Sequence, residues 1–108
     1  MRGDRAPNTY TAGDWPHRAR PLPQAPPGVH YALAMARELD DLADQRGLSH
    51  RAVSAHAGLG PAAVGRIVRG EVYPDVSTLA RLEASLCADL LPSDRHRTLL
   101  PQGDDRQL

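Results

Sequence analysis

The stretch RGLSHRAVSAHAGLGPAAVGRIVRG, residues 46–70, decides the fold of this 108-residue chain. Ser49 is a strong N-cap, because its side-chain oxygen can accept a hydrogen bond from an N–H in the first turn of a helix. The residues after it predict a short helix over 50–57. Gly58 marks the break that follows, since glycine adopts turn conformations that other residues avoid. The first half of the stretch therefore predicts a short helix that ends in a turn.

The second half of the stretch predicts another short helix, over 61–69. Pro61 fits the first turn of this helix, where its missing N–H loses no hydrogen bond. Gly70 then ends the helix. Two short helices joined by a glycine-containing turn form the helix-turn-helix geometry.

Longer apolar patterns flank this pair on both sides. Upstream, one apolar face at helical spacing predicts a helix from residue 29 to Arg46, which Gly47 ends. The residues of this face are Ala32, Met35, Ala36, Leu39, Leu42 and Ala43. Downstream, Pro74-Asp75 opens a further helix with Asp75 as its cap. The apolar stripe of this helix is Val76, Leu79, Leu82, Leu86 and Leu90.

No segment alternates apolar and polar residues for long enough to predict a strand. The chain is therefore expected to be all-α. Its helical part predicts a compact bundle of four to five helices that contains the helix-turn-helix.

A set of residues matches one known pattern in a single register. The set comprises RGLS at 46–49, the small Ser54, the turn Ala57-Gly58-Leu59, the apolar Val64 and Ile67, Arg69-Gly70, and Pro74, Val76, Thr78, Leu79, Leu82 and Leu86. With these residues the segment 39–86 resembles the DNA-binding domain of the Xre family, the lambda repressor and Cro type. The resemblance implies a small, repressor-like transcriptional regulator with double-stranded DNA as its partner.

The resemblance also implies which residues contact DNA. The helix over 61–69 would lie in the major groove, and the helix over 50–57 would cross the backbone with its N-terminus facing phosphate. Arg66 is then the base reader and Arg69 a phosphate contact, while His50 stands where the family often has a phosphate-binding Gln. The expected DNA-binding residues are Ser49, His50, Arg51, Pro61, Ala62, Ala63, Arg66 and Arg69. A reader this small is expected to act as a homodimer on a pseudo-palindromic site.

The charge of residues 45–70 supports the placement of this segment against DNA, whereas the net charge of the whole chain does not. The 13 basic side chains, all of them arginine, balance 13 acidic ones, which excludes a protein that binds nucleic acid by bulk charge. Residues 45–70 nevertheless hold four arginines and no acidic residue, with the aspartates and glutamates on either side. The four are Arg46, Arg51, Arg66 and Arg69. This local excess favours a surface that faces DNA.

Two departures from the family pattern keep a second function open. The helix over 61–69 carries few hydrogen-bonding side chains, because Ala62, Ala63 and Gly65 hold places where base-reading residues are common. Asp40 stands where the family often has a basic residue against phosphate. The alternative is a protein-interaction adaptor that uses this fold with weak or no specific DNA binding.

The two ends of the chain are expected to lie outside the domain, which spans 29–91. Residues 1–28 hold six of the ten prolines and only one aliphatic residue larger than alanine, Leu22, which predicts a disordered arm. Trp15 in this arm is a candidate contact either for the domain itself or for a protein partner. Residues 92–108 predict a polar tail that is either frayed or a short helix. The apolar Leu86, Leu90, Leu91, Leu99 and Leu100 are the candidate dimer contacts.

No catalytic residue, metal site or cofactor is expected. Cys87, the only cysteine, is interpreted as a small buried thiol without a base at helical spacing. The histidines are scattered, and His50 and His56 are six residues apart, which does not place them on one helical face. No apolar run approaches the roughly 18 residues of a membrane span, and the N-terminus lacks the apolar core of a secretory signal. A soluble, cytoplasmic protein without a membrane partner is expected.

Overall fold

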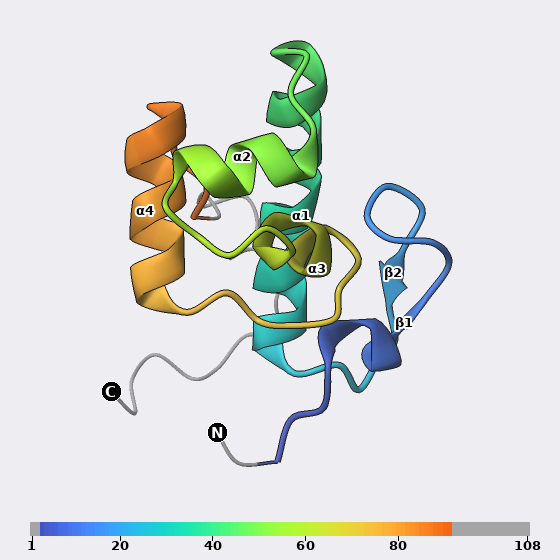
Figure 1. Cartoon of the computed structure of the whole chain (residues 1–108). Helices are drawn as coiled ribbons and strands as arrows, with labels where there is room; N and C mark the ends of the chain where they lie inside the picture. The colour runs from blue at the N-terminus through green and yellow to red at the C-terminus, as the bar shows by residue number, and fades with distance from the viewer. Residues whose placement is uncertain (1–2, 92–108) are drawn as a thin grey trace.

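The computed structural model describes residues 3–91 (Figure 1). Four α-helices dominate it, which confirms the all-α helix-turn-helix bundle, and a two-residue strand pair is added to them. The elements are the 3-10 helix η1 (Pro7–Tyr10), β1 (Thr11–Ala12), β2 (Arg20–Pro21), α1 (Pro27–Gln45), α2 (His50–His56), α3 (Ala63–Val68) and α4 (Val76–Leu86). No helix among the described residues is long and apolar enough to cross a membrane.

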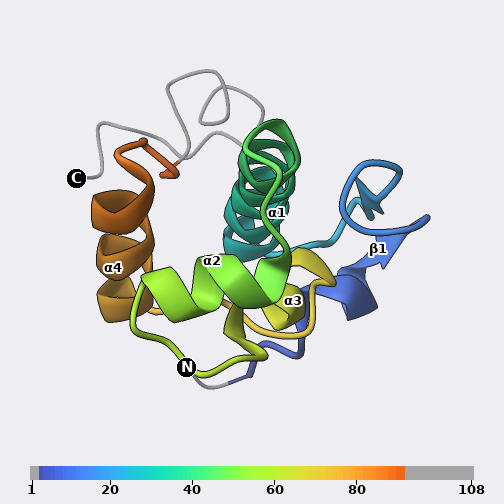
Figure 2. The ribbon, with the colours of Figure 1, turned by 45° about the horizontal axis from the view of Figure 1, so that its top comes forward.

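The long helix α1 forms the axis of the bundle. The short helices α2 and α3 contact α1 and each other, and α4 contacts α2 (Figure 1). The strand pair and α4 lie on opposite sides of α1 in both views (Figures 1 and 2). The core lies between the four helices and consists of Leu39, Ala43, Val53, Ala57, Val64, Ile67, Val68, Leu82, Leu86 and Leu90. These side chains bury the apolar faces that the sequence patterns place on each helix.

The predicted caps of α2 and α4 are confirmed. Ser49 Oγ accepts a hydrogen bond from the N–H of Ala52 at 3.0 Å, and an oxygen of Asp75 accepts one from Thr78 at 2.7 Å. The start of α3 differs from the prediction. This helix begins at Ala63, and Pro61 lies in the turn before it. Pro61 therefore shapes the approach to α3 and is not part of its first turn.

Ser54 supplies the hydrogen bond that the start of α3 lacks. The N-cap of α3 is Ala62, whose side chain has no acceptor. The hydroxyl of Ser54, fully buried on α2, accepts a hydrogen bond from the N–H of Val64 at 3.0 Å and donates one to the carbonyl of His50 at 2.9 Å. One side chain thus satisfies a free donor at the start of α3 and joins the two helices of the motif.

The prediction of a disordered N-terminal arm is wrong for the described residues 3–28. The chain forms η1 and a short hairpin in which Thr11 pairs with Pro21 and Ala12 with Arg20. Small apolar side chains of this segment are buried, among them Ala19 and Ala25, and η1 contacts α1. The prediction of disorder rested on the lack of large aliphatic residues. Buried alanine and proline side chains, together with hydrogen bonds, hold the arm against the bundle instead.

The end of α4 also differs from the expected helix. Cys87 adopts a left-handed conformation with φ of 51° and ends the helix, and its side chain is exposed instead of buried. Leu90 lies beyond the helix but is 3% exposed, so it still completes the core. Val76, assigned to the apolar stripe, is 82% exposed.

This arrangement changes the expected dimer contacts. Leu86 and Leu90 are buried in the core of their own bundle and are not available to a second subunit. Leu91 is the exposed one of these three leucines. Leu99, Leu100 and the tail to which they belong lie outside the described residues.

Candidate nucleic-acid interface

Helix α3 has a buried side and an exposed side, as a helix that reads DNA requires. Val64, Ile67 and Val68 are buried in the core. Arg66 is exposed, and among residues 3–91 it forms no ion pair. Its guanidinium group is therefore available to a ligand at the outer face of the helix-turn-helix.

The turn before α3 extends the exposed side. Pro61 and Ala62 are exposed there, and Ala63 is half-buried at the start of the helix. These three side chains offer only apolar surface, so hydrogen bonding from α3 to a base depends on Arg66.

Arg69 is already engaged within the protein. Its Nε donates to a carboxylate oxygen of Glu71 at 2.7 Å, and this bond holds the pKa of Glu71 below its ordinary value. The same guanidinium group lies over Gly65, where it would approach an added Cβ to 2.9 Å. The local positive excess of the motif is thus smaller than the count of arginines suggests, because Glu71 balances one of the four.

The N-terminus of α2 presents a mixed surface. Ser49 is exposed but its hydroxyl is occupied by the cap, and Arg51 is exposed without an ion pair among residues 3–91. His50 Nε2 lies 2.8 Å from Oδ1 of Asp40 on α1. The imidazole that was expected to contact phosphate is therefore bound to a carboxylate.

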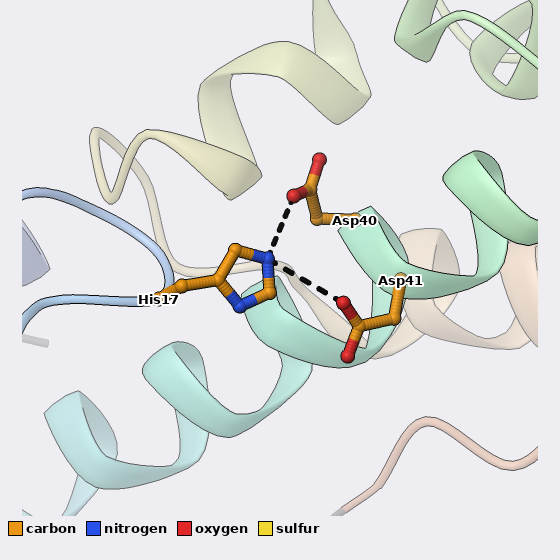
Figure 3. A group of neighbouring side chains, drawn as sticks. All are labelled: His17, Asp40 and Asp41. Carbon is orange, nitrogen blue, oxygen red and sulfur yellow. Dashed lines mark hydrogen bonds and ion pairs between the residues drawn. The ribbon is translucent and has the colours of Figure 1, made fainter.

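The second oxygen of Asp40 has a partner from the arm. His17 Nε2 lies 2.8 Å from Asp40 Oδ2 and 3.5 Å from an oxygen of Asp41 (Figure 3). Partial burial acts to raise the pKa of Asp40, but hydrogen bonds from His50 and His17 outweigh it, and the net shift is downward. The carboxylate of Asp40 is thus held in its charged form between two imidazoles.

These groups line an open hollow of about 590 Å³ beside the start of α2. Its wall is acidic, and it consists of His17, Asp40, Asp41, Ala43, Asp44, Leu48, Ser49 and His50. A negative surface repels phosphate at close range. The hollow therefore works against the phosphate contact that the family pattern places at this end of α2.

The arm also contacts the far end of α3. The backbone N–H and the side-chain amide of Asn8 donate to the carbonyls of Gly70 and Arg69, at 2.9 and 3.2 Å. The ring of Trp15 covers Gly70 so closely that an added Cβ would lie 2.5 Å from it. The carbonyls of the two residues that follow α3 are in this way bound by a segment some 60 residues away in the sequence.

The candidate functional residues form two groups, one predicted from the sequence and one that was not predicted. Arg66 and Arg51 stand on the helix-turn-helix as expected, while His17 from the arm joins Asp40, Asp41 and His50 at one corner of it. The second group was missed because the arm was predicted to be disordered, and no local spacing relates His17 to residues 23 positions later.

Comparison with known proteins agrees with this architecture. The family model described as "Helix-turn-helix domain" matches residues 34–94, more than half of the chain. No curated protein and no solved structure matches the chain. The Xre subfamily stays a prediction, since the match names the domain and not the subfamily. From the matched segment and the described motif together, the chain belongs to the helix-turn-helix domain family, a class of DNA-binding domains.

Proposed function

We propose that the protein is a transcriptional regulator that binds double-stranded DNA with α3 in the major groove. The observation that carries this proposal is Arg66, an exposed arginine without an ion pair among residues 3–91, on the outer face of a helix whose inner face is buried. An arginine in this position can donate two parallel hydrogen bonds to guanine, which discriminates against other bases by about 1–3 kcal/mol.

The remaining expected DNA contacts have unequal roles in the proposal. Arg51 is exposed on α2 and is assigned to phosphate, while Pro61, Ala62 and Ala63 offer apolar contact to base edges or methyl groups. Arg69 contacts phosphate only by leaving or sharing Glu71. Ser49 and His50 are weaker candidates for DNA contacts, because their polar atoms already bond to Ala52 and Asp40.

The proposal includes a homodimer on a pseudo-palindromic site, because proteins with this motif commonly read two half-sites one helical turn apart. Leu91, which is 57% exposed, is the candidate contact within the described residues. Sedimentation at high micromolar concentration should show a dimer. A monomer in that experiment would contradict the dimer for the free protein and leave DNA binding by α3 to be tested separately.

Substitution of Arg66 tests the role of α3. Arg66→Ala should lower the preference for promoter DNA over scrambled DNA, by about 1–3 kcal/mol in binding free energy per base pair read. The matched control is Arg81→Ala, which removes the same charge from α4. Fluorescence anisotropy on both DNAs measures the two variants. Unchanged discrimination in Arg66→Ala would contradict the assignment of Arg66 as the base reader.

One observation favours a second candidate, a protein-interaction adaptor. The start of α2, where this motif meets the DNA backbone, borders a hollow lined by Asp40, Asp41 and Asp44. Such a surface suits a basic partner better than a phosphate. Failure to bind DNA even at low salt, in a protein that is folded, would favour the adaptor over the regulator.

A further inference from the structure

We propose that His17, Asp40 and Asp41 form a binding site for one divalent transition-metal cation of the zinc type. Neither the family nor the proposed DNA binding requires such a site, and His17 lies outside the matched residues 34–94. The site would join the arm to α1 at the corner of the bundle where α2 begins.

The ligand atoms already converge. One imidazole nitrogen and one oxygen from each carboxylate lie within 4.8 Å of one another. Figure 3 shows the ring of His17 entering from the arm, with its nitrogen directed at both carboxylates of α1. A cation between these three atoms needs only small side-chain movements to reach the roughly 2.0–2.2 Å that zinc takes to nitrogen and oxygen.

The backbone around His17 is held in place by one residue of α1. Arg37 donates through Nε to the carbonyl of Pro16 at 2.9 Å and through a terminal nitrogen to the carbonyl of Ala19 at 2.7 Å. These carbonyls lie on either side of His17, and Arg37 lies about one helical turn before Asp40 and Asp41. The two hydrogen bonds from Arg37 therefore fix the backbone on both sides of His17, and this positions the imidazole against the carboxylates.

Asp40 is oriented by a second histidine outside the ligand set. His50 Nε2 bonds to Oδ1 of Asp40 at 2.8 Å, which leaves Oδ2 directed at His17. Hydrogen bonds to the second oxygen of a metal-binding carboxylate commonly fix its direction in this way. The arrangement supplies the supporting contact that a ligand carboxylate needs.

Solvent can reach the three ligands. The side chains of His17, Asp40 and Asp41 are 47%, 30% and 55% exposed, and they border the open hollow of about 590 Å³. Three protein ligands with space for water match an open tetrahedral site. Two carboxylates also balance the charge of one divalent cation, so its binding would remove the repulsion between Asp40 and Asp41.

The donor set selects the kind of metal. One imidazole with two carboxylates suits zinc, cobalt or nickel, whereas magnesium and calcium prefer sites made of oxygen alone. Exposed ligands and open coordination positions indicate a metal ion that can leave the site into solvent, unlike a structural ion enclosed by four protein ligands.

Titration of the full-length, tag-free protein with Co²⁺ and Zn²⁺ tests the site. We expect one Co²⁺ per chain, with visible absorption bands that Zn²⁺ abolishes by competition, and a matching stoichiometry for Zn²⁺ by calorimetry. Mg²⁺ should not compete at equal concentration. A folded protein that binds neither Co²⁺ nor Zn²⁺ would overturn the proposal.

Matched variants assign the ligands. His17→Ala and Asp41→Asn should each weaken Co²⁺ binding by more than about tenfold, since even outer partners of a metal site contribute that much. His56→Ala, an exposed histidine at the end of α2, and Asp44→Asn, a carboxylate on the wall of the same hollow, should leave binding unchanged. Asp41→Asn keeps the hydrogen bond of His17 to Asp40 and so tests the site if His17→Ala loosens the arm. Equal affinity in Asp41→Asn and Asp44→Asn would overturn the assignment.

Discussion

Ser54 is the buried hydroxyl on which the junction of α2 and α3 depends. It is fully buried and bonds at once to the carbonyl of His50 and to the N–H of Val64. The sequence pattern predicts only a small side chain at this position. The structure adds that its oxygen replaces the cap that α3 lacks, so the hydroxyl contributes to the direction in which α3 presents Arg66.

Ser54→Ala should lower the free energy of unfolding by about 1–3 kcal/mol, because the N–H of Val64 then stays buried without an acceptor. Equilibrium denaturation measures the loss. Ser85→Ala, on the exposed side of α4, is the control and should change stability by less than about 0.5 kcal/mol. Equal stability of the two variants would contradict the role given to the hydroxyl.

Asp75 makes the stability of α4 depend on pH. The backbone N–H of Thr78 bonds to this carboxylate and holds its pKa below the ordinary value of 3.8. The folded state therefore binds this proton less readily than the unfolded chain does. The contribution to stability is complete above pH 3.8 and is lost as the pH falls through the lower, folded pKa.

Asp75→Asn tests this dependence, since asparagine caps a helix about as well as aspartate but does not titrate. The unfolding free energy of the wild-type protein should fall more steeply than that of the variant as the pH drops below 3.8. Denaturation curves at several acidic pH values measure both. Parallel pH profiles would show that the charge of Asp75 does not support α4.

At the scale of elements, the arm is the feature that local patterns could not predict. The helices α1, α2 and α4, with the caps Ser49 and Asp75, follow from apolar spacing and from cap and glycine signals, which act between neighbouring residues. The packing of the arm depends on contacts between distant residues, such as Trp15 with Gly70. Such contacts leave no periodic signal in a proline-rich segment.

The candidate site divides in the same way. Arg66 and the half-buried Ala63 are placed by the register of α3, which the sequence pattern sets through Val64 and Ile67. The bond of His50 to Asp40 and the approach of His17 could not be predicted, because both depend on how α2 and the arm pack against α1. The sequence marked Asp40 as a departure from the family without indicating its partners.

The contact between the arm and α3 can be tested at Gly70. Gly70→Ala should disturb the packing of Trp15, the only tryptophan, because the added Cβ would lie 2.5 Å from its ring. The control is Gly47→Ala, which has a similar positive φ but no atom near the added Cβ. Both changes cost about 1–2 kcal/mol for the left-handed conformation.

Only Gly70→Ala should add a change in the tryptophan emission spectrum. Fluorescence of both variants under native conditions provides the measurement. An unchanged spectrum in Gly70→Ala, or the same shift in both variants, would contradict the docking of Trp15 on the end of α3.

At the scale of the whole molecule, the two proposed functions depend on different parts of the charge distribution. The chain is neutral, and its helix-turn-helix presents Arg51 and Arg66 without partners among residues 3–91, beside the acidic hollow at the start of α2. DNA binding with so few free arginines should depend on a small number of phosphate and base contacts. The DNA-binding constant should therefore fall as the salt concentration rises, but less steeply than for a protein that makes many phosphate contacts.

The most direct test of DNA binding is a fluorescence-anisotropy titration of the wild-type protein against its own promoter DNA and a scrambled control at several salt concentrations. We expect preference for the promoter. The logarithm of the binding constant should fall with the logarithm of salt concentration with a slope of about −2 to −5, as for a dimer that makes a few phosphate contacts per subunit. Absence of binding to either DNA at low salt would contradict the proposed regulator and favour a protein partner.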